Sequence, residues 1–222
     1  PDGAEGQVSR HQVGGRRHAL MPTHPSEPAA ALHGHGLIRP WRIAAATAGA
    51  ATLSLNHEGD VGAFPLAFSS EQTFALAESG LEQILRVKNE SRTPGPFGLG
   101  LHPFFRRGRR SLLQFRAQRL WRFQVGGGGA EADIPPALDF SAGAVLAEEA
   151  LDVTFLGFGG AAVIENDGAI VRIESDAPHL HLYAPAQSDF FCLEPVTHAP
   201  GAFGADILEP GETLAIRLTI AA

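Results

Sequence analysis

The most constraining feature of this sequence is a series of short strand-like segments separated by turn signals at near-regular intervals. In the second half of the chain, Asn166-Asp167-Gly168 and Glu209-Pro210-Gly211-Glu212 are such signals. The segments between and around them are 162–165, 169–173, 179–183, 190–193 and 214–218. Short strands without strand–helix alternation are typical of an antiparallel sandwich or barrel. We therefore expect an all-β protein.

The first half of the chain continues this pattern. Apolar residues alternate with polar ones in 41–43, 52–55, 66–68 and 74–76. Residues 81–87 favour a strand, with one or two helical turns as the alternative. The 26 glycines and 16 prolines supply the turns that many short strands need. Only residues 144–150 have a composition typical of a helix.

Length and charge limit the number of domains and the classes of partner. The 222 residues fit one domain, 1–222, with a poorly patterned part at 1–31 in which Gly14-Gly15 predicts a hairpin turn. The net charge of −7 argues against a nucleic-acid partner.

No apolar run approaches the roughly 18 residues of a membrane span, so we expect no membrane partner. The single cysteine, Cys192, excludes an internal disulfide and fits a reducing compartment, which predicts a cytoplasmic location.

Two ionisable residues stand in surroundings that favour acid–base chemistry. Glu194 ends the apolar segment 190–193 and precedes Pro195, which stops the hydrogen-bond ladder. Desolvation there would raise the carboxyl pKa toward that of a general base, although a glutamate that leaves the sheet for water is an equal alternative. His102, between glycines and Phe104-Phe105, is a candidate general acid, with a structural histidine as the alternative.

Other polar clusters allow different interpretations. His33-Gly34-His35 could supply half of a metal site, but a cupin-type site needs a glutamate where this chain has Ile38-Arg39-Pro40. His179 and His181 would share one face of a strand, and exposed surface histidines are favoured over cleft residues. Seven arginines between positions 106 and 122 could attract phosphate, although a solvated edge or loop is the simpler interpretation.

Four short motifs follow one another along the chain. Residues 33–41 contain His-Gly and Pro-Trp, and residues 98–105 read Gly-x-Gly-x-His-Pro-Phe-Phe. Residues 151–158 read Leu-Asp-x-x-Phe-x-Gly-Phe, and residues 192–198 read Cys-Leu-Glu-Pro-x-Thr-His. Each motif is weak alone. In this order, from about Gly15 to the C-terminus, the chain resembles the aldose 1-epimerase family, also called galactose-mutarotase-like proteins.

The resemblance implies a galactose-mutarotase-like supersandwich, which is a large antiparallel β-sandwich. It implies interconversion of the α and β anomers of a free aldohexose without a cofactor or a metal. By position, His102 matches the family's catalytic acid, Glu194 its catalytic base, and His33 and Asp152 its sugar-binding residues. We choose His33 over its neighbour because its distance to the motif's tryptophan fits better. Further substrate-binding candidates are His35, Arg39 and Trp41.

The chemistry of ring opening explains these residue types. A hemiacetal opens when a base removes the C1 hydroxyl proton and an acid protonates the ring oxygen. Rotation about C1–C2 and the reverse transfers then close the ring on the other face. His102 and Glu194 are far apart in sequence, so only a sheet that joins distant strands can pair them on one sugar.

Two departures from the family's pattern affect these expectations. Phe158 replaces the usual tryptophan of the third motif. The family's Asn-Arg motif, whose arginine binds sugar, has no counterpart, and Arg10 and Arg16 are the nearest candidates. With the start at Pro1, this leads us to expect an N-terminally incomplete domain. The alternatives are a non-catalytic carbohydrate-binding protein and a hexose-6-phosphate 1-epimerase, with the oligomeric state left open.

Overall fold

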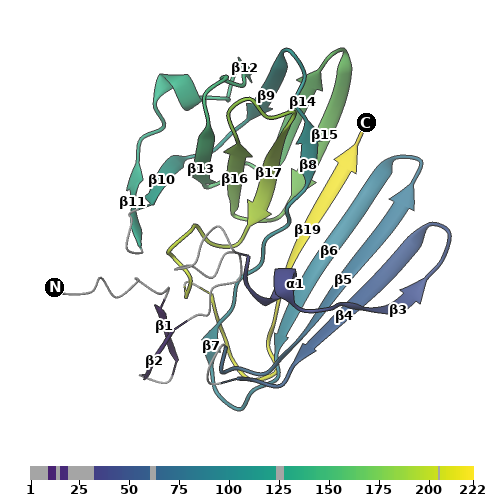
Figure 1. Cartoon of the computed structure of the whole chain (residues 1–222), viewed down its shortest axis with the longest axis vertical. Helices are drawn as coiled ribbons and strands as arrows, with labels where there is room; N and C mark the ends of the chain where they lie inside the picture. Colours follow the sequence, from purple (N-terminus) through teal and green to yellow (C-terminus); the bar gives the residue numbers. More distant parts are fainter. Residues whose placement is uncertain (1–9, 14–15, 20–32, 61–63, 124–127, 205) are drawn as a thin grey trace.

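The computed structural model describes residues 10–13, 16–19, 33–60, 64–123, 128–204 and 206–222. Two large antiparallel sheets contain most of its strands (Figure 1). The expected all-β antiparallel sandwich is therefore confirmed. Within the described residues, no helix combines the length and the apolar character needed to cross a membrane.

The larger sheet has nine strands in the described part of the chain. Their spatial order is β12 (Ala144–Val145), β9 (Ser111–Phe115), β14 (Ala161–Asn166), β15 (Ala169–Ser175), β19 (Thr213–Ala221), β6 (Gly80–Asn89), β5 (Phe68–Ala77), β4 (Ala50–His57) and β3 (Arg42–Ala46). Strand β6 confirms that 81–87 is a strand. Its first residue, Gly80, has φ +131° and passes so close to β19 that a Cβ would lie 2.1 Å from the carbonyl oxygen of Ile220. The β5–β6 turn therefore needs glycine.

The second sheet has six strands in the described residues. Their order is β11 (Gly129–Ala132), β10 (Arg119–Phe123), β13 (Leu151–Leu156), β16 (His179–Ala184), β17 (Phe190–Val196) and β8 (Phe104–Arg106). The smaller elements are the pair β7 (Gly95–Pro96) and β18 (Ile207–Leu208), the pair β1 (Arg10–Val13) and β2 (Arg16–Ala19), the helix α1 (Gly34–Ile38) and the 3-10 turn η1 (Pro136–Leu138). The turn predicted at Gly14-Gly15 lies outside the described residues, between the paired strands β1 and β2.

The hydrophobic core joins the two large sheets. One cluster of buried side chains includes Ile173 and Leu218 of the nine-stranded sheet with Leu180 and Leu193 of the six-stranded sheet. Because successive side chains in a strand point to opposite faces, the residues between those of β13, β16 and β17 that enter the core face away from it. The six-stranded sheet therefore has one apolar face in the core and one face available for polar residues.

The helix-like composition of residues 144–150 does not produce a helix. Ala144 and Val145 instead pair with β9 as the edge strand β12, and Leu146 is buried and donates its backbone N–H to the carbonyl of Ser111. Pairing with an existing sheet edge and burial of Leu146 outweigh the helix propensity of this short segment. The helix that does form, α1, lies in the first motif, where no helix was expected.

Candidate active site

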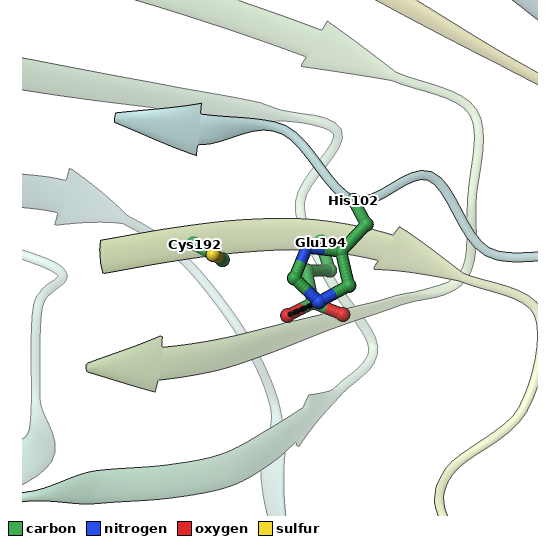
Figure 2. A group of neighbouring side chains, drawn as sticks. All are labelled: His102, Cys192 and Glu194. Carbon is green, nitrogen blue, oxygen red and sulfur yellow. Dashed lines mark ion pairs between the residues drawn. The ribbon is translucent and has the colours of Figure 1, made fainter. Parts of the chain in front are cut away.

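His102 and Glu194 lie side by side on the polar side of the six-stranded sheet (Figure 2). The Nε2 atom of His102 is 3.3 Å from Oε1 of Glu194. Glu194 comes from β17, and His102 comes from the segment between β7 and β8. The Glu194 side chain is 8% exposed and that of His102 is 31% exposed, so the pair is protected but can be reached from solvent.

Backbone pairing between two of the sequence motifs positions His102. The backbone N–H of Thr197 donates to the carbonyl of Leu99, and the N–H of Leu99 donates to the Thr197 hydroxyl. The ring of His198 packs over Gly98 so closely that a Cβ there would lie 2.1 Å from its Cε1. The glycine-rich motif and the motif that contains Glu194 therefore form one structural unit.

Burial shifts both members of the pair toward their neutral forms. Desolvation raises the pKa of Glu194 to about 7, with His181 opposing this shift and Asp152 adding to it. Desolvation and then the nearby His33 lower the pKa of His102. The two groups lie close enough for a proton to pass between them. The arrangement suits proton exchange near neutral pH.

A row of polar side chains crosses the sheet beside this pair. Glu194, His181 and Thr154 occupy directly opposite positions on β17, β16 and β13. The Nδ1 atom of His181 lies 2.8 Å from the Thr154 hydroxyl, and its Nε2 lies 3.2 Å from Oδ1 of Asp152. The hydrogen bond to His181 is the main cause that lowers the pKa of Asp152. His181, which lies opposite Glu194, therefore also holds the carboxylate of Asp152.

His181 is the residue that sequence reasoning underrated. Its side chain is only 14% exposed, whereas surface exposure was the favoured interpretation. Because His181 stands between the core residues Leu180 and Leu182, the alternation of the strand places its side chain on the face opposite the core. The strand register that places it opposite Glu194 is a long-range property that the segment alone does not contain.

Aromatic rings that are exposed or half-buried extend from the acid–base pair. The Phe104 ring stacks on the His102 ring, with centroids 4.9 Å apart and an interplanar angle of 22°. Phe190 lies 5.1 Å from Phe104, and Tyr183 lies 6.5 Å from Phe190. Together they provide apolar surface next to proton-transfer groups, an arrangement suited to a ligand with one apolar and one hydroxylated side.

The residues of the first motif separate in space. The His33 ring lies 4.9 Å from the His102 ring, edge-on. The His35 ring instead lies 4.6 Å from that of His57, on another side of the segment. Trp41 packs against the hydrophobic core and donates from Nε1 to the Gly36 carbonyl at 3.0 Å. Arg39 is exposed at the end of α1.

The structure thus gathers four of the expected residues on one side of the sheet. His102, Glu194 and His33 are in contact, and Asp152 joins them through His181. The candidates His35 and Trp41 make their contacts elsewhere.

Cys192 is a further group beside the pair. In the described residues, the single group of three or more histidine, cysteine or acidic side chains close enough to hold a metal ion is His102, Cys192 and Glu194. Burial raises the pKa of the Cys192 thiol to about 12. The pattern Cys-x-Glu on one strand predicts that both side chains share a face.

The arginine-rich segment contacts protein groups. Arg107 donates to the carbonyls of Pro185 and Ala147. Arg119 pairs with the carboxylates of Glu131 and Asp133 at a sheet edge. For Arg107 and Arg119, these contacts favour a structural role over phosphate binding.

Known proteins share both the sequence pattern and the fold. A family model described as Aldose 1-epimerase matches residues 7–221. The uncharacterized protein YphB of Escherichia coli (strain K12) is 29% identical over 225 residues, which cover 93% of this chain and 76% of that protein. A crystal structure of an Escherichia coli K12 protein has a TM-score of 0.85 at 26% identity, covering 96% of this chain and 78% of that one. The crystal structure of galactose 1-epimerase from Lactobacillus acidophilus NCFM has a TM-score of 0.76 at 20% identity, covering 97% and 75%.

Proposed function

The chain belongs to the aldose 1-epimerase family, and on this premise we propose that it interconverts the α and β anomers of a free aldohexose. The observation that carries the proposal is the 3.3 Å distance between Nε2 of His102 and Oε1 of Glu194, two groups from distant parts of the chain. A pyranose needs one group at its C1 hydroxyl and another at its ring oxygen, and these atoms are close neighbours on the sugar. One imidazole and one carboxyl group in contact can serve both atoms.

In the proposed reaction, the Glu194 carboxylate accepts the proton of the C1 hydroxyl while the His102 imidazolium donates a proton to the ring oxygen. The bond between C1 and the ring oxygen breaks, and C1 becomes an aldehyde carbon. Rotation about C1–C2 then presents the other face of the aldehyde. On closure, His102 takes back the proton from the attacking hydroxyl, and Glu194 returns its proton to the C1 oxygen.

The pair needs one shared proton for this cycle. Burial favours a neutral imidazole and a protonated Glu194, whose pKa is raised to about 7. Transfer of that single proton from Oε1 to Nε2 gives the reactive pair of imidazolium and carboxylate. At 3.3 Å this transfer requires no rearrangement of the chain. One shared proton is therefore enough for the acid and base roles expected of His102 and Glu194.

Binding of the sugar is assigned to the surrounding residues. His33, whose ring contacts His102, would hold the region of the ring oxygen. Asp152, kept ionised by its hydrogen bond to His181, would accept hydrogen bonds from paired hydroxyls. Phe104 and Phe190 would pack against the apolar C–H face of the sugar. His181 would act as a positioning residue for Asp152.

The substrate and the location are further parts of the proposal. The Lactobacillus acidophilus relative is named a galactose 1-epimerase, so galactose is the first sugar to test, followed by glucose. The reaction as proposed uses only side chains and needs no cofactor. A cytoplasmic location remains the prediction from the single cysteine.

The test is anomer exchange, measured by NMR saturation transfer or polarimetry, for the wild type and for His102→Ala and Glu194→Gln. The expected result is fast exchange by the wild type and little above the solvent rate for both variants. Equal acceleration by all three proteins would overturn the proposal. Sugar binding by calorimetry without exchange would select a carbohydrate-binding protein, and preferential use of glucose 6-phosphate would select a hexose-6-phosphate 1-epimerase.

A further inference from the structure

Cys192 is a buried group that the proposed reaction does not use. It precedes Glu194 by two residues on β17, so both side chains point to the same face, toward His102 (Figure 2). A ring nitrogen of His102, Sγ of Cys192 and a carboxylate oxygen of Glu194 all lie within 4.8 Å of one another. Three different donor atoms therefore lie close enough together to be candidate ligands of one ion.

The donor set has a defined metal preference. Imidazole nitrogen, thiolate sulfur and carboxylate oxygen are the ligands of Zn²⁺, and three protein ligands with one open position are the arrangement of accessible zinc sites. Mg²⁺ and Ca²⁺ prefer oxygen ligands throughout. We infer that His102, Cys192 and Glu194 form a reversible binding site for a thiophilic divalent cation such as Zn²⁺, which inhibits the enzyme by occupying its acid–base pair.

The spacing of the donors needs only a small adjustment. Metal bonds of about 2.1 Å place two tetrahedral ligands about 3.4 Å apart, close to the 3.3 Å between His102 and Glu194. Cys192 and Glu194 are held on a central strand, whereas His102 is on an irregular segment and is 31% exposed. His102 is therefore the ligand that can move to close the site, and its exposure provides the entry path.

The surroundings favour an inhibitory cation over a resident cofactor. A metal-binding histidine normally donates its other ring N–H to an acceptor, and loss of that partner weakens binding by about 10–100-fold. Among the described residues, the buried Nδ1 atom of His102 has no hydrogen-bond partner in another residue. Binding must also displace the protons of the thiol and the carboxyl group. Both features predict weak, reversible binding.

The binding of the cation is independent of the proposed function, whereas its inhibitory effect rests on that function. Co²⁺ is a suitable probe because cobalt–thiolate bonds give a near-ultraviolet charge-transfer band that zinc does not. Cys192 is the single cysteine of the sequence, so such a band can report no other thiol. The matched variants are Cys192→Ser and Cys192→Ala, which leave the acid–base pair in place.

The expected result is a charge-transfer band when Co²⁺ is added to the wild type, its removal by Zn²⁺ and not by Mg²⁺, and no band in either variant. Zinc should inhibit anomer exchange at least tenfold more weakly in folded Cys192→Ala, whose exchange rate without zinc should equal that of the wild type. Absence of the band in the wild type, or its persistence in both variants, would overturn the inference. A band in a protein that shows no anomer exchange would support the site and leave the failure with the proposed function alone.

Discussion

His33 and His35 are separated by one glycine, yet they belong to two regions with different chemistry. His33 lies edge-on to His102, beside the carboxyl group of Glu194 and the polar face of the six-stranded sheet. His35 lies against His57 and the rings of Phe64 and Phe68, under the nine-stranded sheet. We call the first region the acid–base cluster and the second the histidine–phenylalanine cluster.

The backbone explains how one motif supplies both regions. His33 has φ +57° and Gly34 has φ +56°, so the N-cap and the first residue of α1 are both in the left-handed conformation. This reversal turns the two imidazoles in different directions. Left-handed backbone at a residue other than glycine costs free energy and is concentrated at functional sites. The comparison shows that two histidines of one motif can lie in different surroundings.

The two clusters also differ in what surrounds the imidazole. A carboxyl group faces His102, so a proton can be exchanged within the pair. Burial, His57 and Arg39 act together on His35 and lower its pKa to about 4. An imidazole that stays neutral among apolar rings has a structural role. The following changes test this division between catalysis and stability.

The largest effect is expected from removal of the base in the acid–base cluster. Glu194→Gln keeps the shape of the side chain but cannot accept the C1 hydroxyl proton, so anomer exchange should fall by about 10²–10⁴-fold. The rate is measured by NMR exchange on galactose. Glu165→Gln, on an exposed position of β14, is the matched control and should keep the wild-type rate. A Glu194→Gln variant as fast as this control would contradict the division.

A comparable effect on stability is expected in the histidine–phenylalanine cluster. Phe68→Ala removes a buried ring that contacts His35, His57 and Phe97, and should cost about 3–5 kcal/mol of unfolding free energy. Urea denaturation measures this loss. Phe123→Ala, at an exposed ring, should cost far less. The exchange rate per folded molecule should stay at the wild-type value. A fall in this rate of more than tenfold would contradict the division between the two clusters.

A smaller effect is expected when pH is lowered. His35 has a folded-state pKa of about 4, below its ordinary value of 6.5, so folding favours its neutral form. Its contribution to stability is complete above pH 6.5 and is lost as pH falls toward 4, by at most about 3 kcal/mol. The wild type should therefore lose more unfolding free energy over this range than His35→Leu, which cannot titrate there. Parallel pH curves for the two proteins would contradict the assignment.

The smallest effect is expected at the hydrogen bond that ties Trp41 to α1. Trp41→Phe keeps the packing but loses the bond from Nε1 to the Gly36 carbonyl, at a cost of about 0.5–1.5 kcal/mol. Because this bond holds the segment that orients His35, the NMR titration of His35 should shift. Trp121→Phe, which loses a similar bond to the Pro200 carbonyl, should cost a similar amount and leave that titration unchanged.

The fold was largely predictable because its signals are local. Alternation and turn residues such as Asn166-Asp167-Gly168 specify β14 and β15 without help from the rest of the chain. The exception was 144–150, where pairing with β9 decided the outcome. Edge pairing depends on a partner about thirty residues away, and local composition does not contain it.

The candidate site was predictable only in part, for the same physical reason. Glu194 and His102 were identified by their apolar and glycine-rich surroundings, and the structure adds the distance between them. His181 was underrated because its importance comes from cross-strand register. For Trp41, contact with a sugar and packing in the core were equal alternatives from the sequence, and its indole packs against the core.

The cross-strand row of Glu194, His181 and Thr154 exists only when the three strands pair in the correct register. Successive side chains of a strand point to opposite faces, so a slip of one position in β17 would put Leu193 or Pro195 in the place of Glu194 opposite His181. Such a misaligned molecule would lack the proposed catalytic base beside His102. Under the proposed function, the anomer exchange rate normalised to protein concentration would therefore report the fraction of correctly aligned molecules.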